Sequence, residues 1–71
     1  MKTIKDLEAL IAEYTDRAQL DYPLYVEKEP GMTCYCICYD ADELGRCYFA
    51  TGSVEYLLAY MDGRMDGEFG S

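Results

Sequence analysis

The chain has 71 residues, which is enough for one small domain and too few to surround a deep catalytic cleft with core. Its 14 acidic and 6 basic residues leave a net charge of −8, which disfavours binding to nucleic-acid phosphates and to anionic membrane surfaces. Apolar residues make up 51% of the chain, which favours a folded domain over a disordered one. We therefore expect the partners to be basic proteins.

Residues 3–20 have the pattern of an amphipathic helix. Their apolar positions recur at spacings of three and four: Ile4, Leu7, Ile11, Tyr14 and Ala18. Thr3 and Asp6 resemble a capping box at the start of this helix. Pro23 prevents its continuation, because proline lacks the amide donor that a helix needs.

Three short segments rich in β-branched and aromatic residues follow, at residues 24–28, 33–39 and 46–51. Turn residues separate them, so we expect three antiparallel strands joined as a meander. Ser53 is a good N-cap for a second helix, and Gly63 is a natural stop for it. The predicted fold is an α+β domain of order αβββα, with both helices on one face of the sheet.

Residues 63–71 contain three glycines and show no hydrophobic periodicity. We expect them to form a flexible tail, so that the domain covers residues 1–62.

The register of the second hairpin decides which side chains share a face. If its loop has four residues, 41–44, Cys38 lies opposite Cys47 and Cys36 opposite Phe49. This register puts all four cysteines and Phe49 on one face, which we predict to lie under the helices because free cysteine is among the most buried residue types. The opposite face then carries the residues that we call the tyrosine face: Tyr25, Tyr35, Ile37, Tyr39 and Tyr48.

The turn at residues 29–31 leaves two alternatives for the first strand. A three-residue turn adds Leu24 and Val26 to the core and puts Tyr25 and Glu27 outside. A two-residue Pro-Gly turn reverses that strand, but it suits hairpins poorly, and we prefer the first arrangement.

The predicted topology brings the end of each helix and the second hairpin loop to one pole of the domain. Acidic residues are frequent there, and we call this set the acidic pole: Asp21, Asp40, Asp42, Glu43, Asp62 and Asp66. Carboxylates near the C-terminus of a helix oppose its macrodipole, so stability alone explains them poorly. We predict that the acidic pole contacts a basic surface of a partner.

Catalytic and cofactor motifs are absent from the sequence. It contains no histidine, which removes the commonest general base and the Cys-His nucleophile. The cysteines are Cys34, Cys36, Cys38 and Cys47, and they lack the CxxC spacing of zinc sites. We interpret them as buried, reduced thiols, with a structural zinc site or a Cys38–Cys47 disulfide as alternatives. We predict no enzymatic activity and no cofactor.

Three functions remain for such a chain. The first is a small acidic protein-binding module, in its sharpest form an inhibitor that covers the nucleic-acid-binding surface of a partner, of the kind that phages or other mobile elements encode. The second is a homo-oligomeric assembly subunit, in the simplest case a homodimer, that pairs through the tyrosine face. The third is a metal-binding domain that uses the cysteines.

No 18-residue apolar run and no signal-peptide pattern occur, so we expect a cytoplasmic location without membrane contact.

Overall fold

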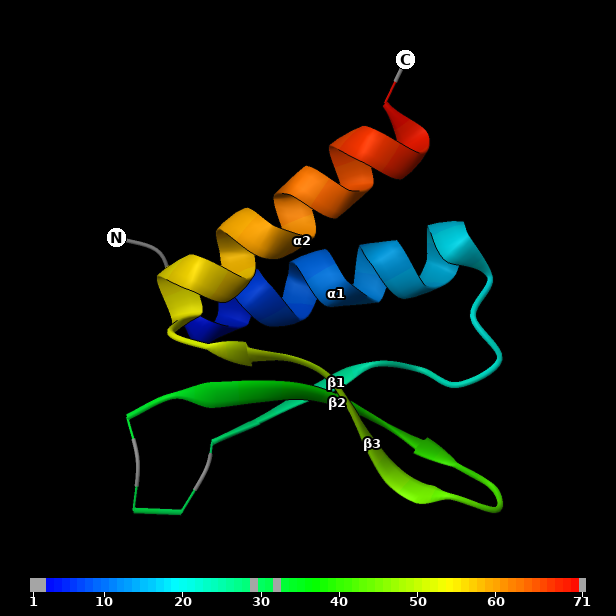
Figure 1. Cartoon of the computed structure of the whole chain (residues 1–71). Coiled ribbons are helices and arrows are strands. Elements are labelled where there is room, and N and C mark those ends of the chain that lie inside the picture. The colour runs from blue at the N-terminus through cyan, green and yellow to red at the C-terminus, as the bar shows by residue number, and fades with distance from the viewer. Residues whose placement is uncertain (1–2, 29, 32, 71) are drawn as a thin grey trace.

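The computed structural model describes residues 3–28, 30–31 and 33–70. Its elements are α1 (Ile4–Ala18), β1 (Tyr25–Lys28), β2 (Tyr35–Ala41), β3 (Gly45–Gly52) and α2 (Val54–Phe69). The strands form one antiparallel sheet in the order β1-β2-β3, and both helices cover the same face of it (Figure 1). The predicted α+β fold and its αβββα order are confirmed.

No helix in the part of the chain that the structure describes has the length and apolar content needed to cross a bilayer.

Both helices begin where the sequence predicts an N-cap. The backbone N–H of Thr3 donates to the carboxylate of Asp6 at 2.8 Å, and the backbone N–H of Tyr56 donates to the hydroxyl of Ser53 at 3.1 Å. These contacts satisfy polar groups at the helix starts that would otherwise lack partners. From these starts the two helices run in the same general direction and spread apart toward their C-terminal ends (Figure 1).

The second helix is longer than expected, because it passes Gly63 and ends at Phe69. Leu57, Met61 and Met65 recur at every fourth position, and all three are buried. Phe69 continues this spacing and packs against the core. Residues 63–69 therefore belong to the packed domain, and the predicted boundary at residue 62 does not coincide with the end of a structural element.

The second hairpin has a different register from the predicted one. Ala41 pairs with Gly45, so the loop contains three residues, 42–44, rather than four. Gly45 has a φ of 74°, the left-handed geometry that a three-residue hairpin loop requires after its turn. The register then shifts between Ile37, which lies opposite Ala50, and Cys38, which lies opposite Tyr48. Phe49 is thus the extra residue of a β-bulge.

This register reverses the predicted faces of β2, whereas Phe49 and Tyr48 of β3 lie on the sides predicted for them. Ile37 is fully buried and belongs to the core under the helices, together with Leu24. Cys36 and Cys38 alternate with Ile37 along β2, so their side chains point to the opposite face. The prediction that the cysteines of this strand lie under the helices is wrong, because a one-residue change of register exchanges the two faces.

The arrangement preferred for the first strand is confirmed. Leu24 is buried in the core and Val26 packs against it, whereas Tyr25 and Glu27 lie opposite Cys38 and Cys36 on the open face. The connection to β2 is longer than a three-residue turn, since Lys28 pairs with Tyr35. Residues 29 and 32 of this connection lie outside the described residues.

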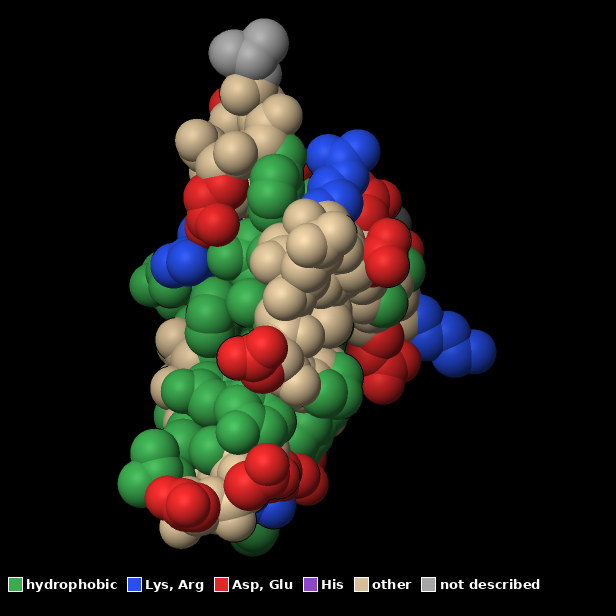
Figure 2. All heavy atoms as spheres, turned by 90° about the vertical axis from the view of Figure 1, so that its right-hand side faces the viewer, with side chains coloured by type: hydrophobic (Ala, Val, Ile, Leu, Met, Phe, Trp, Pro, Cys, Tyr) green, Lys and Arg blue, Asp and Glu red, His purple; other side chains and the backbone are tan. Residues whose placement is uncertain are grey.

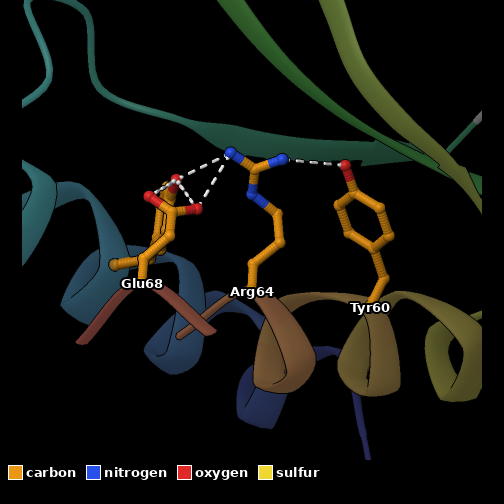
Figure 3. A network of polar contacts seen from close by, with 4 residues as sticks. Tyr60, Arg64 and Glu68 are labelled. Carbon is orange, nitrogen blue, oxygen red and sulfur yellow. Dashed lines mark hydrogen bonds and ion pairs between the residues drawn. The ribbon is translucent and has the colours of Figure 1, made fainter. Parts of the chain in front are cut away.

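A cluster around Arg64 joins α2 to the rest of the domain (Figure 3). The guanidinium donates to the hydroxyl of Tyr60 at 3.3 Å and to that of Tyr14 at 3.1 Å, and it pairs with the carboxylate of Glu68 at 3.0 Å. The hydroxyl of Tyr14, a residue that is 2% exposed, also donates to Glu68 at 2.9 Å. The guanidinium carbon lies 4.8 Å from the ring centroid of Phe49, within cation–π distance. The hydrogen bond with Tyr14 is the main cause of a raised pKa of Arg64.

The corrected faces lead to a first prediction. Ile37→Ala should lower the free energy of unfolding by about 2–5 kcal/mol, because it opens a cavity in the core. Tyr48→Ala should cost about 0.5 kcal/mol or less, because Tyr48 is 59% exposed on the open face. Urea unfolding of both variants measures the difference, and equal losses would contradict the assignment of faces.

A second prediction concerns the Arg64 cluster. Arg64→Leu should cost about 1–3 kcal/mol, because it removes hydrogen bonds from a charged group to partly buried partners. The matched control is Arg17→Leu, whose ion pair with Glu13 at 3.7 Å is exposed and should be worth about 0–1 kcal/mol. Thermal unfolding compares the two variants. If Arg17→Leu is the more damaging change, the cluster does not have the structural role given to it here.

Candidate partner-binding groove

The residues of the predicted acidic pole do not form one cluster. α1, α2 and the second hairpin do end on the same side of the molecule, but α2 rises away from the sheet (Figure 1). A view onto this side shows carboxylates scattered among hydrophobic side chains (Figure 2). Asp42 and Glu43 lie in the hairpin loop, and the carboxylate of Asp40 accepts a hydrogen bond from the hydroxyl of Tyr25 at 2.9 Å. Asp62 and Asp66 belong to a different surface.

That surface is a groove between α1 and α2. Its first part has a volume of about 570 Å³, and an adjoining part of about 470 Å³ extends toward the C-terminal ends of the helices. Leu10, Glu13 and Asp62 line both parts, so the two are continuous. The residues that line it are, with the exception of Met65, different from the buried stripes of the two helices. We call it the interhelical groove.

The interhelical groove combines negative charge with apolar surface. Its carboxylates come from both helices: Asp6, Glu13, Glu55, Asp62 and Asp66. Leu10 and Leu58 are half-buried between them. The one basic residue among the described lining residues is Arg17, which pairs with Glu13. The groove is thus an acidic channel with apolar contact points.

Three of these carboxylates, Glu55, Asp62 and Asp66, belong to no ion pair within the described residues. Asp66 lies in the last turns of α2, where a negative charge opposes the helix macrodipole. Helix stability therefore accounts for Glu55, which lies in the first turn of α2, but not for Asp66.

The predicted tyrosine face is divided between the two sides of the sheet. Tyr25 and Tyr48 flank Cys38 on the open face. Tyr35 and Tyr39 lie on the helix side with Ile37, where they pack against the core. On the open face an ion pair of 2.9 Å joins Arg46 to Glu27, and the Tyr25–Asp40 hydrogen bond lies beside it. The open face is therefore a mixed polar surface rather than a tyrosine platform.

None of the four cysteines forms a disulfide within the described residues. Cys36 and Cys38 are buried, as predicted, although on the open face, where the larger side chains of the neighbouring strands flank them. Cys38 lies opposite Tyr48 and not opposite Cys47, so the predicted cross-strand cysteine pair does not form. Within residues 3–28, 30–31 and 33–70, no three cysteine or carboxylate side chains gather as metal ligands would.

Ending α2 at Gly63 removed from the sequence-based prediction the residues after position 62 that line the second part of the groove. The parallel course of the two helices follows from the αβββα order, in which a three-stranded meander separates them. The acidic positions of α2 at spacings of four to seven, Glu55, Asp62 and Asp66, were a signal that they share one side of that helix.

Comparisons of the chain with protein-family models, with curated proteins and with solved structures found no match.

The position of the acidic residues along α2 leads to a third prediction. Asp66→Asn should raise the free energy of unfolding by about 0.3–1 kcal/mol, because it removes a negative charge from the C-terminal part of the helix. Glu55→Gln should lower it by a similar amount, because Glu55 lies in the first turn. Thermal unfolding at low ionic strength measures both. A large loss of stability in Asp66→Asn would show that this carboxylate has a structural role.

Proposed function

We propose that this chain is a non-enzymatic binding module that takes up a basic amphipathic helix of a partner protein in the interhelical groove. The observation that carries the proposal is the row of five carboxylates along a groove that also exposes Leu10 and Leu58. A helix with lysines or arginines beside a strip of leucines would place its positive groups against the carboxylates and its leucines against Leu10 and Leu58. Grooves between helices commonly receive partner helices in this way.

The chemistry of the charges supports a basic occupant. The chain carries a net charge of −8, and Glu55, Asp62 and Asp66 have no positive partner among the described residues. Electrostatic complementarity of this kind accelerates association and excludes acidic competitors. The apolar contact with the leucines would then hold the complex, since burial of apolar area supplies most of the free energy of association.

The proposal includes an inhibitory role. A basic helix that binds nucleic acid does so through lysines and arginines that neutralise phosphates. If the groove binds those side chains, the partner cannot hold nucleic acid at the same time. Four cysteines without a disulfide in the described part of the chain suit a reducing compartment, and we place this activity in the cytoplasm.

A fourth prediction tests the groove with a defined probe. The probe is a synthetic 18-residue helical peptide that carries leucines on one face and lysines on the other, titrated into the isotopically labelled protein. We expect chemical-shift changes along α1 and α2 and an affinity that falls with rising salt. The triple variant Glu55→Gln, Asp62→Asn, Asp66→Asn should slow association about tenfold at low salt, because it removes the steering charges.

The matched control is the triple variant Asp40→Asn, Asp42→Asn, Glu43→Gln, which has the same net charge but leaves the groove intact. It should retain the association rate of the unchanged protein to within about twofold, because its charges lie outside the binding surface. Equal slowing by both variants would mean that net charge alone attracts the peptide. A greater effect of the hairpin variant would place the binding surface at the loop of residues 42–44.

A further inference from the structure

A smaller pocket lies where α1 ends, and it shares no lining residue with the interhelical groove. Its volume is about 330 Å³, and the residues that line it are Leu20, Asp21, Tyr22, Leu24, Tyr39 and Phe49. This size is at the lower limit for small-molecule sites and suits a single long side chain. Figure 2 views the end of the molecule where this pocket lies, and hydrophobic side chains cover much of that end.

The pocket is built from three parts of the chain. α1 stops at Gln19, whose φ of 52° turns the backbone away from the helix axis. The following loop places Tyr22 against Tyr39 of β2, with ring centroids 6.2 Å apart and planes inclined by only 19°. Phe49 enters from β3, where the bulge turns it to the helix side. Two stacked tyrosines and a phenylalanine thus line one small hollow.

The pocket has one charged group, the exposed carboxylate of Asp21. Asp21 forms no ion pair within the described residues. Aromatic faces attract cations, and apolar walls accommodate the methylene stem of a lysine or arginine. The chain already uses this chemistry internally, since the guanidinium of Arg64 lies over Phe49 and that of Arg17 lies 5.9 Å from the ring centroid of Phe69.

We propose that this pocket receives one cationic side chain of a partner, an arginine in preference to a lysine. A planar guanidinium stacks on aromatic rings and is less strongly hydrated than an ammonium group, so it loses less on entering an apolar site. Its stem would lie against Leu20 and Leu24, its plane against the tyrosines, and its charge beside Asp21. The inference rests on the proposed function, because a basic partner supplies the arginine, but the pocket can be tested without that partner.

The test is an NMR titration of the labelled protein with N-acetyl-arginine N-methylamide. We expect the ring signals of Tyr22, Tyr39 and Phe49 to shift. N-acetyl-norleucine N-methylamide, which has a stem without the charge, should bind about fivefold more weakly. Tyr22→Leu keeps apolar volume but removes a ring, and it should also weaken arginine binding about fivefold. Asp21→Asn should weaken arginine binding more than Asp62→Asn, which removes the same charge from the groove.

Each outcome bears on the pocket separately from the groove. The inference is overturned if the norleucine compound binds as tightly as the arginine compound, or if a folded Tyr22→Leu variant keeps the affinity for the arginine compound. It is also overturned if the chemical-shift changes are spread over all carboxylates of the protein. If the arginine compound fails to bind while the leucine–lysine peptide still occupies the groove, only the pocket assignment is wrong. If the arginine compound binds the pocket while the peptide does not bind the groove, only the proposed function is wrong.

Discussion

The guanidinium of Arg64 contacts side chains of α1, α2 and β3, and it thereby links the two helices to the sheet. It bonds to Tyr14 of α1 and to Tyr60 and Glu68 of α2, and it lies over Phe49 of β3. The domain needs such a link because it is thin, with extents of 40 × 37 × 16 Å, and because its helices cover only one face of the sheet. A small domain of this kind has limited apolar area to bury, so we expect a charged group shared by several aromatic partners to contribute to its stability.

The same cluster explains where the proposed binding surfaces lie. It holds the C-terminal half of α2 to α1 and β3 on the helix side of the sheet, which leaves other stripes of both helices free to form the interhelical groove. Acidic side chains that have no role in the core occupy that groove. The guanidinium of Arg64 is thus used inside the domain, whereas the carboxylates of the groove line its surface, and we take this arrangement as the basis of the proposed preference for basic partners.

The order of the elements could be predicted from the sequence, whereas the faces of the sheet could not. Helical periodicity in α1, the caps at Thr3 and Ser53, and the turn residues are local signals that each segment carries by itself. The face of β2 depends on pairing, and a loop of three residues with a bulge at Phe49 reversed it. Gly45 was the available signal for the shorter loop, and the spacing of Met61, Met65 and Phe69 was the signal that α2 passes Gly63. No local pattern indicates that Arg64 reaches Tyr14, because that contact joins residues 50 positions apart.

The proposed function requires that the groove between α1 and α2, and not the open face of the sheet, holds a basic helix. The direct test is to record intermolecular nuclear Overhauser effects between the leucine methyl groups of a bound leucine–lysine peptide and the protein. We expect contacts from the peptide methyl groups to the methyl groups of Leu10 and Leu58. Contacts to the rings of Tyr25 and Tyr48, with none to the two leucines, would contradict it and would place the partner on the open face of the sheet.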